Sequence, residues 1–268
     1  MPTYLDQIIK AHRKAATLDS RNLEDLIDQA EQLTENSNLE KLSFKNALSQ
    51  KSSNSVKIIA EIKRRSPSKG SLSENLDPVL LAKAYSQGGA SCISVLTDQD
   101  FFGGSPKDLQ QVRQVVDLPI LRKDFTISKA DICDAKLMGA DAILLIVAAL
   151  SKAELFDFLQ LANRLRLDAL VEVHDEKELD IALEIGAQII GVNQRDLFSF
   201  KVDINRAEQL VDKIPDSVVK VAESGISQPQ DLSRLAKVGF DAALIGEAFV
   251  TSQDPQMAIE KMKLAGTT

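Results

Sequence analysis

The 268-residue chain contains only two cysteines, Cys92 and Cys133, and no Cys-x-x-Cys pair or Cys/His cluster. Two cysteines cannot build a disulfide framework, and without clustered ligands we expect no zinc site. The two histidines, His12 and His174, stand far apart in the sequence, so we expect neither to bind a metal ion. These shortages predict a protein of a reducing compartment that uses no metal.

Long apolar runs are also missing. The longest, residues 142–150, is about half of the ~20 residues that a membrane-spanning helix needs. The N-terminus lacks the apolar core of a signal peptide, and the early Asp6 disfavours a transit peptide. The formal charge is −7, from 39 acidic and 32 basic residues, which disfavours a general nucleic-acid binder. We therefore expect a cytoplasmic protein that binds neither membranes nor nucleic acids.

What the sequence does contain is an alternation of short apolar runs with amphipathic helical stretches. The runs are rich in Val, Ile, Leu and Ala, which is typical of parallel strands covered by helices. Eight strands are predicted, at residues 58–62, 91–96, 118–122, 142–147, 168–173, 189–193, 218–222 and 242–246. Successive strands start about 26 residues apart on average, enough for one strand, one helix and two short loops.

Glycine ends several of the predicted helices just before a strand. Four such junctions are Gly89-Ala90, Gly139-Ala140, Gly186-Ala187 and Gly239-Phe240. They precede the second, fourth, sixth and eighth strands, which indicates a weak repeat of βαβα pairs with a left-handed residue at each helix end. Eight strand–helix steps in about 210 residues favour a closed (β/α)8 TIM barrel over an open doubly wound sheet. No GxGxxG or GxxxxGK[ST] motif follows a strand, which weakens a nucleotide-binding interpretation.

About 55 residues precede the first predicted strand. They contain two or three amphipathic helices, at residues 4–18, 23–33 and 42–48, which are too few and too charged for a separate domain. We therefore predict one barrel domain over residues 1–268. Residues 1–55 form a helical extension that packs on the barrel and lies over its mouth.

The chemistry of such a barrel lies where the strands end. Glu61 and Lys63 are two residues apart on the first strand and share a face, which is the barrel interior if Ile62 faces the helices. The other strand ends add Lys123, Glu172, Asn193 and Arg195. Each charge could pair as part of the fold, but four strands that converge on one rim favour an active site.

The seventh and eighth strands run into glycine-containing turns at residues 223–226 and 245–248. Small residues there expose backbone N–H groups, and a short helix is predicted to start at Glu247. In this fold loops 7 and 8, together with a helix N-terminus, form the usual phosphate site. We therefore expect a phosphorylated small-molecule ligand.

Seven motifs together resemble those of the indole-3-glycerol-phosphate synthase family. They are IAEIKRRSPSKG (59–70), SVLTDQDFFGGS (94–105), LRKDF (121–125), LVEVH (170–174), GVNQRDL (191–197), AESGI (222–226) and IGEAF (245–249). The resemblance implies a carbon–carbon lyase of tryptophan biosynthesis that needs no cofactor. It converts 1-(2-carboxyphenylamino)-1-deoxyribulose 5-phosphate to indole-3-glycerol phosphate and releases CO2 and water. One departure is Gln194, where the family commonly has Asn, and it affects contacts at the substrate edge.

The resemblance also assigns catalytic roles. Ring closure needs an acid for the ketone oxygen, and loss of water needs an acid and a base. Lys123 and Lys63 are the implied acids and Glu172 the implied base, while Glu61 and Glu223 orient or assist. Because Lys63 shares its strand face with Glu61, we expect Lys123 to be the freer acid and to serve ring closure.

The implied substrate contacts form three groups. Asn193 would hydrogen-bond the hydroxyls, and Arg195 would hold a carboxylate or a loop. The phosphate would be held by Ser224, Gly225, Gly246 and the backbone N–H of Glu247, with Ser66 in the same cleft. The aromatic ring needs an apolar slot, for which the candidates are Pro67, Phe101 and Phe125.

Two other functions remain open from the sequence. A Schiff-base aldolase would also use a lysine at a barrel strand end. A non-catalytic phosphometabolite-binding barrel would be expected to have lost a rim charge, and none is lost here. Phosphoribosylanthranilate isomerase, a related barrel, is disfavoured because its first strand would end in a catalytic cysteine. We expect the chain to be a monomer.

Overall fold

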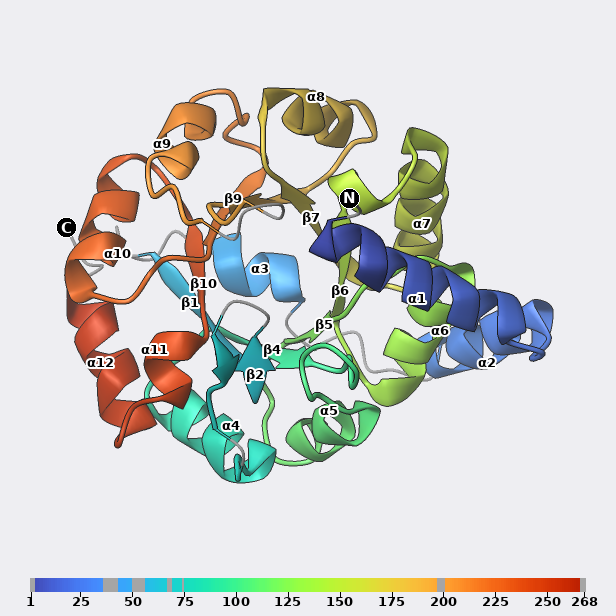
Figure 1. Ribbon diagram of the computed structural model, residues 1–268, viewed down its shortest axis with the longest axis horizontal. Coiled ribbons are helices and arrows are strands. Elements are labelled where there is room, and N and C mark those ends of the chain that lie inside the picture. Colours follow the sequence, from blue (N-terminus) through green and yellow to red (C-terminus); the bar gives the residue numbers. More distant parts are fainter. Residues whose placement is uncertain are drawn as a thin grey trace.

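The computed structural model describes residues 3–35, 43–49, 56–66, 69–73, 75–196 and 201–265. Eight parallel strands close into a barrel in the order β1-β10-β9-β8-β7-β6-β5-β4, because β1 pairs with both β10 and β4. Helices surround the ring of strands (Figure 1). The predicted TIM barrel is confirmed.

The strands lie where the apolar runs predicted them. The barrel strands are β1 (Lys57–Ile62), β4 (Cys92–Leu96), β5 (Ile120–Lys123), β6 (Ala142–Ile146), β7 (Asp168–Val173), β8 (Ile189–Asn193), β9 (Val219–Glu223) and β10 (Ala242–Ile245). A small antiparallel hairpin of β2 (Arg65–Ser66) and β3 (Gly70–Ser71) lies in the loop after β1. The sequence did not predict this hairpin, because two-residue strands have no readable period.

One helix follows each barrel strand on the outside. These helices are α4 (Pro78–Gln87), α5 (Pro106–Arg113), α6 (Lys129–Met138), α7 (Lys152–Arg164), α8 (Glu176–Glu184), α9 (Arg206–Val211), α10 (Pro229–Lys237) and α12 (Pro255–Ala265). The short turns η1 (Val147–Ala149) and α11 (Glu247–Val250) follow β6 and β10. The predicted junction glycines Gly89, Gly139, Gly186 and Gly239 all have positive φ, between 83° and 91°. The repeated use of a left-handed residue before every second strand is therefore confirmed.

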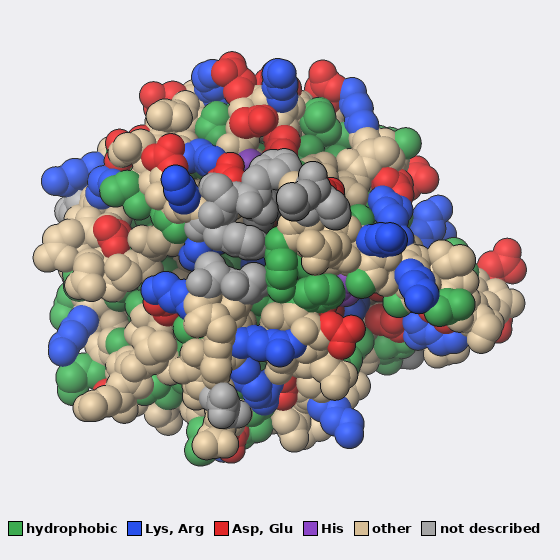
Figure 2. All heavy atoms as spheres, viewed as in Figure 1, with side chains coloured by type: hydrophobic (Ala, Val, Ile, Leu, Met, Phe, Trp, Pro, Cys, Tyr) green, Lys and Arg blue, Asp and Glu red, His purple; other side chains and the backbone are tan. Residues whose placement is uncertain are grey.

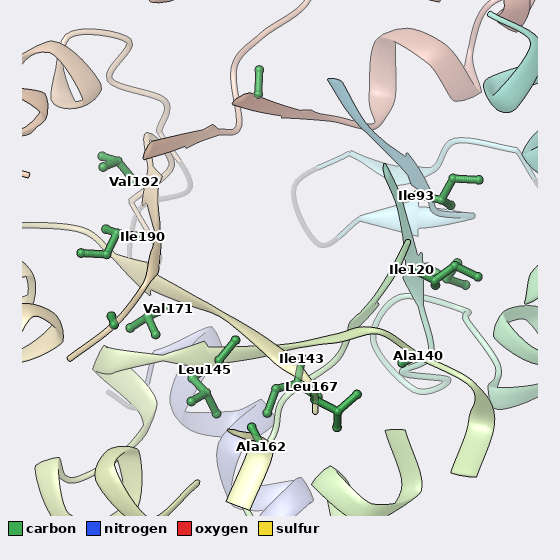
Figure 3. Close-up of a cluster of buried hydrophobic side chains, with 14 of the residues drawn as sticks. Ile93, Ile120, Ala140, Ile143, Leu145, Ala162, Leu167, Val171, Ile190 and Val192 are labelled. Atoms are coloured by element: carbon green, nitrogen blue, oxygen red, sulfur yellow. The ribbon is translucent and has the colours of Figure 1, made fainter. Parts of the chain in front are cut away.

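Alternation along each strand divides the core into two parts. Outward residues such as Ile58, Ala60 and Ile62 pack with the helices, and Figure 3 shows more of this outer cluster. Inward residues, including Ile59, Leu121, Leu170 and Val221, fill the barrel interior. Since Ile59 faces inward, Glu61 does so as well. The first strand thus carries a carboxylate into the barrel, as predicted.

The N-terminal extension consists of three helices, α1 (Tyr4–Leu18), α2 (Leu23–Glu35) and α3 (Phe44–Ser49). α2 packs along α6 on the outside of the barrel. α3 closes the end of the barrel opposite the strand ends, where Phe44 and Leu48 join the interior cluster, and it lies within the ring in Figure 1. α1 lies beside the mouth, against the loops after β4 and β6. The prediction that the extension lies over the mouth is therefore wrong for α2 and α3.

No helix in the described part of the chain has the length and apolar character to span a membrane. On the face seen in Figure 2, Lys and Arg lie interspersed with Asp and Glu. The described part of this face therefore forms no single-sign surface of the kind that a polyanion would need.

Candidate active site

A cavity of about 630 Å³ opens at the C-terminal ends of the strands. All six predicted catalytic residues line it: Glu61, Lys63, Lys123, Glu172, Asn193 and Glu223. The predicted substrate contacts that also line it are Ser66, Phe125, Arg195, Ser224, Gly225, Gly246 and Glu247. Pro67 lies outside the described residues.

Four ionisable side chains come from alternate barrel strands: Glu61 from β1, Lys123 from β5, Glu172 from β7 and Glu223 from β9. Alternate strands of a TIM barrel contribute to the same interior layer. The Lys123 Nζ atom lies 3.5 Å from Glu172 Oε2 and 3.8 Å from Glu223 Oε2. The strand geometry therefore gathers residues that are up to 162 positions apart in sequence.

The two lysines predicted as acids are both paired. Lys63 Nζ donates to Glu61 Oε2, and Lys123 is shared between Glu172 and Glu223. Burial alone would lower the pKa of Lys123, but the charges of Glu172, Glu223 and Glu61 outweigh it and hold that pKa above its usual value. The expectation that Lys123 is freer than Lys63 is wrong. It considered only residues that are neighbours in sequence, whereas the partners of Lys123 come from other strands.

The carboxyls of Glu172 and Glu223 differ in protonation. Burial acts to raise the pKa of Glu172, but Lys123, His174 and the amide of Asn193 hold it well below its usual range. Burial, followed by the charge of Glu172, raises the pKa of Glu223 to about 8 against the pull of Lys123. Glu223 Oε1 is buried without a hydrogen-bond partner in the described structure. At neutral pH Glu172 is therefore an available base and Glu223 a neutral acid.

Two glycines make room for the side chains of Glu223 and Glu61. A Cβ at Gly191 of β8 would overlap Glu223 Oε1, and a Cβ at Gly246 would overlap Glu61 Oε2. Gly246 was predicted only as a phosphate contact, and Gly191 was not singled out at all. A glycine inside a strand is a signal of such close approach, and it could have identified Gly191.

The turn after β9 has a left-handed backbone at two successive residues, with φ of 67° at Ser224 and 75° at Gly225. Gln194 donates from Nε2 to the Ser224 carbonyl over 2.7 Å and is only 1% exposed. The predicted substrate-edge role of Gln194 does not fit this placement. The side chain instead supports the turn through this hydrogen bond, and Gln194 does not line the cavity.

The aromatic wall of the cavity consists of Phe102 and Phe125, whose ring centroids lie 6.2 Å apart. Phe101 points elsewhere and packs edge-on against Tyr4 of α1 at 5.8 Å. Asp98 Oδ1 accepts the backbone N–H groups of both Phe101 and Phe102, which sets the direction of each. Sequence reasoning chose Phe101 of the adjacent pair, because nothing local distinguishes two consecutive phenylalanines.

An ion pair joins the β2–β3 hairpin loop to the start of α11, where Lys69 Nζ bonds Glu247 Oε1. Both residues line the cavity. Lys69 was not predicted, and it comes from the hairpin loop that the sequence did not predict either. It places a cation beside the Glu247 carboxylate.

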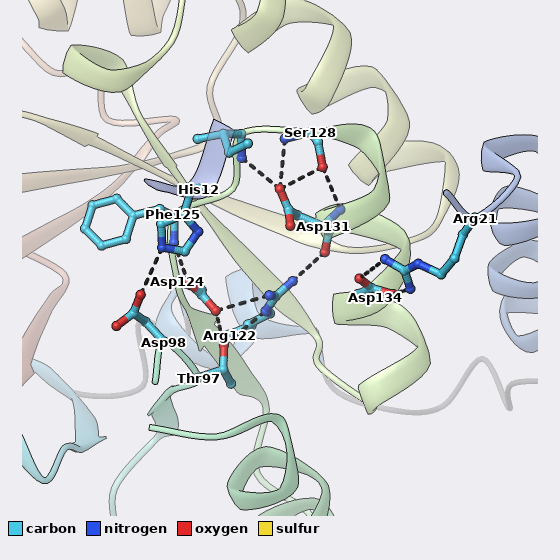
Figure 4. Close-up of polar contacts among 11 residues, drawn as sticks. His12, Arg21, Thr97, Asp98, Arg122, Asp124, Phe125, Ser128, Asp131 and Asp134 are labelled. Atoms are coloured by element: carbon cyan, nitrogen blue, oxygen red, sulfur yellow. Dashed lines mark hydrogen bonds and ion pairs between the residues drawn. The ribbon is translucent and has the colours of Figure 1, made fainter. Parts of the chain in front are cut away.

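His12, Asp98 and Asp124 form the one group of potential metal ligands found among the described residues, with ligand atoms within 4.8 Å of one another (Figure 4). Each of them is already hydrogen-bonded. His12 Nε2 lies 2.9 Å from Asp98 Oδ2, and Asp124 Oδ2 accepts from Arg122 at 3.1 Å. The first contact joins α1 to the loop after β4, and the His12 ring also lies 5.4 Å from that of Phe125 in the loop after β5.

Comparison with known proteins identifies the family. A family model described as indole-3-glycerol phosphate synthase matches residues 5–262. An indole-3-glycerol phosphate synthase of Chloroherpeton thalassium is 47% identical over 94% of this chain and 96% of its own length. Another from a Parafrankia species is 50% identical over 79% of both chains.

Solved structures show the same architecture at much lower identity. 3-Hexulose-6-phosphate synthase from Salmonella typhimurium superposes with a TM-score of 0.64 at 14% identity, covering 78% of this chain and 98% of that one. Thiamine phosphate pyrophosphorylase from Pyrococcus furiosus gives 0.59 at 16% identity, covering 80% and 96%. These likenesses concern the barrel alone, whereas the family match extends over nearly the whole sequence. The chain therefore belongs to the indole-3-glycerol phosphate synthase family.

Proposed function

We propose that this chain converts 1-(2-carboxyphenylamino)-1-deoxyribulose 5-phosphate to indole-3-glycerol phosphate, with loss of CO2 and water. The observation that carries the proposal is the layer of Glu61, Lys123, Glu172 and Glu223 beside the turns after β9 and β10. Family membership supports the same activity. Because a bond between carbon and a carboxylate is broken without hydrolysis or oxidation, the enzyme is a carbon–carbon lyase.

The phosphate binds at the turns after β9 and β10. Ser224, Gly225, Gly246 and the backbone N–H of Glu247 hold it, with Ser66 across the cleft. The left-handed turn at Ser224 and Gly225 supports this assignment, since small residues let an anion approach the backbone closely.

The aromatic ring of the substrate occupies the slot formed by Phe102 and Phe125, and Pro67 remains a proposed further contact. Arg195 lines the same cavity and is the candidate partner for the substrate carboxylate. Asn193 donates from Nδ2 to Glu172 Oε1 over 3.1 Å, which aligns it for the substrate hydroxyls as well.

Lys123 starts the reaction. It donates a proton to the ketone oxygen while the carboxylate-bearing ring carbon attacks the ketone carbon and forms the new C–C bond. The carboxylate then leaves as CO2, and its bonding electrons return to the ring. The buried charge of Lys123 is little screened by water, so it also stabilises the negative charge that develops on the ketone oxygen.

Loss of water completes the indole. Lys63 protonates the departing hydroxyl, which formed from the ketone oxygen, and Glu172 accepts the remaining proton. Glu61 orients Lys63 through their ion pair, and the neutral Glu223 assists as a hydrogen-bond donor. The opposite protonation states of Glu172 and Glu223 support a division into base and donor.

A fluorescence assay for the indole product tests the activity. The purified chain should form indole-3-glycerol phosphate from the ribulose phosphate substrate without an added cofactor. Borohydride added during turnover should leave the protein mass unchanged. A covalent adduct on Lys123 or Lys63 together with absent indole fluorescence would instead support the Schiff-base aldolase.

A further inference from the structure

His174 lies directly after β7, with its ring between two carboxylates. Its Nδ1 is 3.0 Å from Glu178 Oε2 on α8, and its Nε2 is 3.4 Å from Glu172 Oε1. The same Glu178 oxygen accepts the His174 backbone N–H over 2.7 Å. Glu178 thus holds His174 through one contact with the ring and one with the backbone, and this leaves Nε2 directed at Glu172.

This placement favours the protonated ring, whose Nε2 is buried without a hydrogen bond to any described residue and lies within ion-pair distance of Glu172 Oε1. An imidazolium can donate from both nitrogens, whereas a neutral ring would set a lone pair against one of the two carboxylates. The side chain of His174 is 11% exposed and that of Glu172 only 2%, so water cannot substitute for the missing donor. Burial alone would lower the pKa of His174, but Glu172 and Glu178 raise it to about 10.

The charges around this ring are unequal in number. In the group of charges around Lys63 and Lys123, the three carboxyls of Glu61, Glu172 and Glu223 face these two ammonium groups, and Lys63 is paired with Glu61. Lys69 and Glu247 of the same cavity pair with each other, and Asp124 and Arg195 also line it. Lys123 alone is then shared by Glu172 and Glu223. η1, which also packs against β7 and α8, carries no titratable residue. His174 supplies the third positive charge and directs it at Glu172.

We propose that His174 is a positioning residue, which keeps Glu172 rather than Glu223 the ionised member of the carboxyl pair. Without the imidazolium, the single proton on the pair shifts from Glu223 toward Glu172, so Glu172 is ionised in a smaller fraction of the molecules. The inference rests on the proposed role of Glu172, and it adds a residue outside the cavity lining to that role. Glu178 takes part indirectly, by orienting the ring.

Proton NMR tests the charge state without any measurement of catalysis. The chain has two histidines, so a His12→Asn variant assigns the remaining ring signals to His174. In the wild-type chain we expect the His174 signals to titrate above about pH 8, well beyond the usual value of about 6.5. Titration below about pH 8 overturns the proposal, whether or not Glu172 proves to be the base.

The kinetic test compares His174→Asn with the wild-type chain across pH. We expect the variant-to-wild-type ratio of kcat to be about 0.1 near pH 6.5, a pKa unit being tenfold in population. The ratio should rise only above about pH 8, the pKa of Glu223 in the wild-type chain, because loss of the His174 charge raises the pH at which the pair loses its proton. An unchanged kcat, or a loss that is the same at every pH, overturns the proposal, because a merely structural role predicts the latter.

A second variant keeps the test valid if His174→Asn does not fold. Glu178→Gln leaves the ring in place and removes one of its two charge partners, so a smaller shift in the same direction is expected. The matched control is Glu176→Gln, in the first turn of the same helix, whose carboxylate pairs with Lys213. Equal pH profiles for Glu178→Gln and Glu176→Gln would contradict the proposal.

Discussion

At the scale of single residues, two glutamates of the cavity, Glu172 and Glu223, differ in protonation although their side chains are identical. Glu172 and Glu223 both contact Lys123, yet Glu172 has the additional contacts with His174 and Asn193. Glu223 Oε1 faces Gly191 and has no such partner in the described structure. Unequal surroundings, and not residue type, thus separate the two pKa values.

This difference predicts unequal effects of amide substitution. Glu172→Gln should lower kcat by roughly 10²–10⁴-fold, the usual scale for a lost general base. Glu223→Gln should cost less than about tenfold at pH 7, because the amide resembles the neutral carboxyl in shape and hydrogen bonding. The pKa of Glu223 is raised to about 8, so the wild-type carboxyl ionises as the pH rises through 8 and the amide does not. Measurement of kcat against pH for both variants tests this difference, and equal losses of kcat for the two variants would contradict it.

The two lysines should also separate kinetically. Lys123→Met should lower kcat by roughly 10²–10⁴-fold with a smaller change in KM, because its proton is needed in the transition state. Lys63→Met should change both constants, since Lys63 lines the cavity and in the proposed binding mode also contacts the substrate's anionic groups. Steady-state kinetics with the fluorescence assay measure both. A near-normal kcat for Lys123→Met would transfer the first acid step to Lys63.

Gln194 should act on binding alone. Gln194→Ala removes the hydrogen bond to the Ser224 carbonyl, which helps to hold a non-glycine residue at positive φ. One lost neutral hydrogen bond is worth about 1 kcal/mol, so we expect KM to rise about fivefold with kcat nearly unchanged. Gln194→Asn is the control for the amide group itself. A fall in kcat with unchanged KM would show that the turn does not bind the phosphate.

At the scale of elements, the extension helices differ in what they contact. α1 reaches the cavity through the loop after β4, because His12 pairs with Asp98, which in turn holds the backbone of Phe102. α2 contributes the buried residues Leu26 and Ala30 to the outer core. α1 therefore belongs with substrate binding, and α2 with stability.

Two truncations test that division. Removal of residues 1–20 should leave a folded barrel with KM raised about tenfold, since it deletes only α1. Removal of residues 1–40 also uncovers the apolar face of α6, and loss of about 3 kcal/mol should lower Tm by roughly 10 °C. Thermal melting and kinetics of the two truncated chains distinguish the effects. Equal Tm values would show that α2 adds no stability.

The elements also show what could be predicted. All eight barrel strands were found, because each is a buried apolar run with a fixed spacing, and inward facing followed from alternation, as for Glu61 and Lys63. The position of α3 and the choice of Phe102 over Phe101 depend on contacts between distant segments. The pairing of Lys69 with Glu247 does too, since 178 positions separate them. Local patterns carry no information about such contacts.

At the scale of the whole molecule, the two ends of the barrel serve different purposes. The C-terminal end holds the charged layer and the cavity, at the cost of buried like charges. The opposite end is apolar, and there Phe44, Ala47 and Leu48 of α3 seal the interior beneath Ile59 and Leu121. In TIM barrels this N-terminal face contributes stability and not catalysis.

Phe44→Ala should therefore separate stability from activity. Phe44 is fully buried, so the truncation leaves a cavity and should cost about 3–5 kcal/mol, which lowers Tm on the order of 10 °C. The substituted residue lies at the far end of the barrel from Lys123 and Glu172, so kcat and KM well below Tm should stay within about twofold of the wild-type values. The matched control is Phe156→Ala on α7, where the ring is 49% exposed and little stability should be lost. A Phe44→Ala variant that melts normally, or that loses activity while still folded, would contradict this division of the barrel.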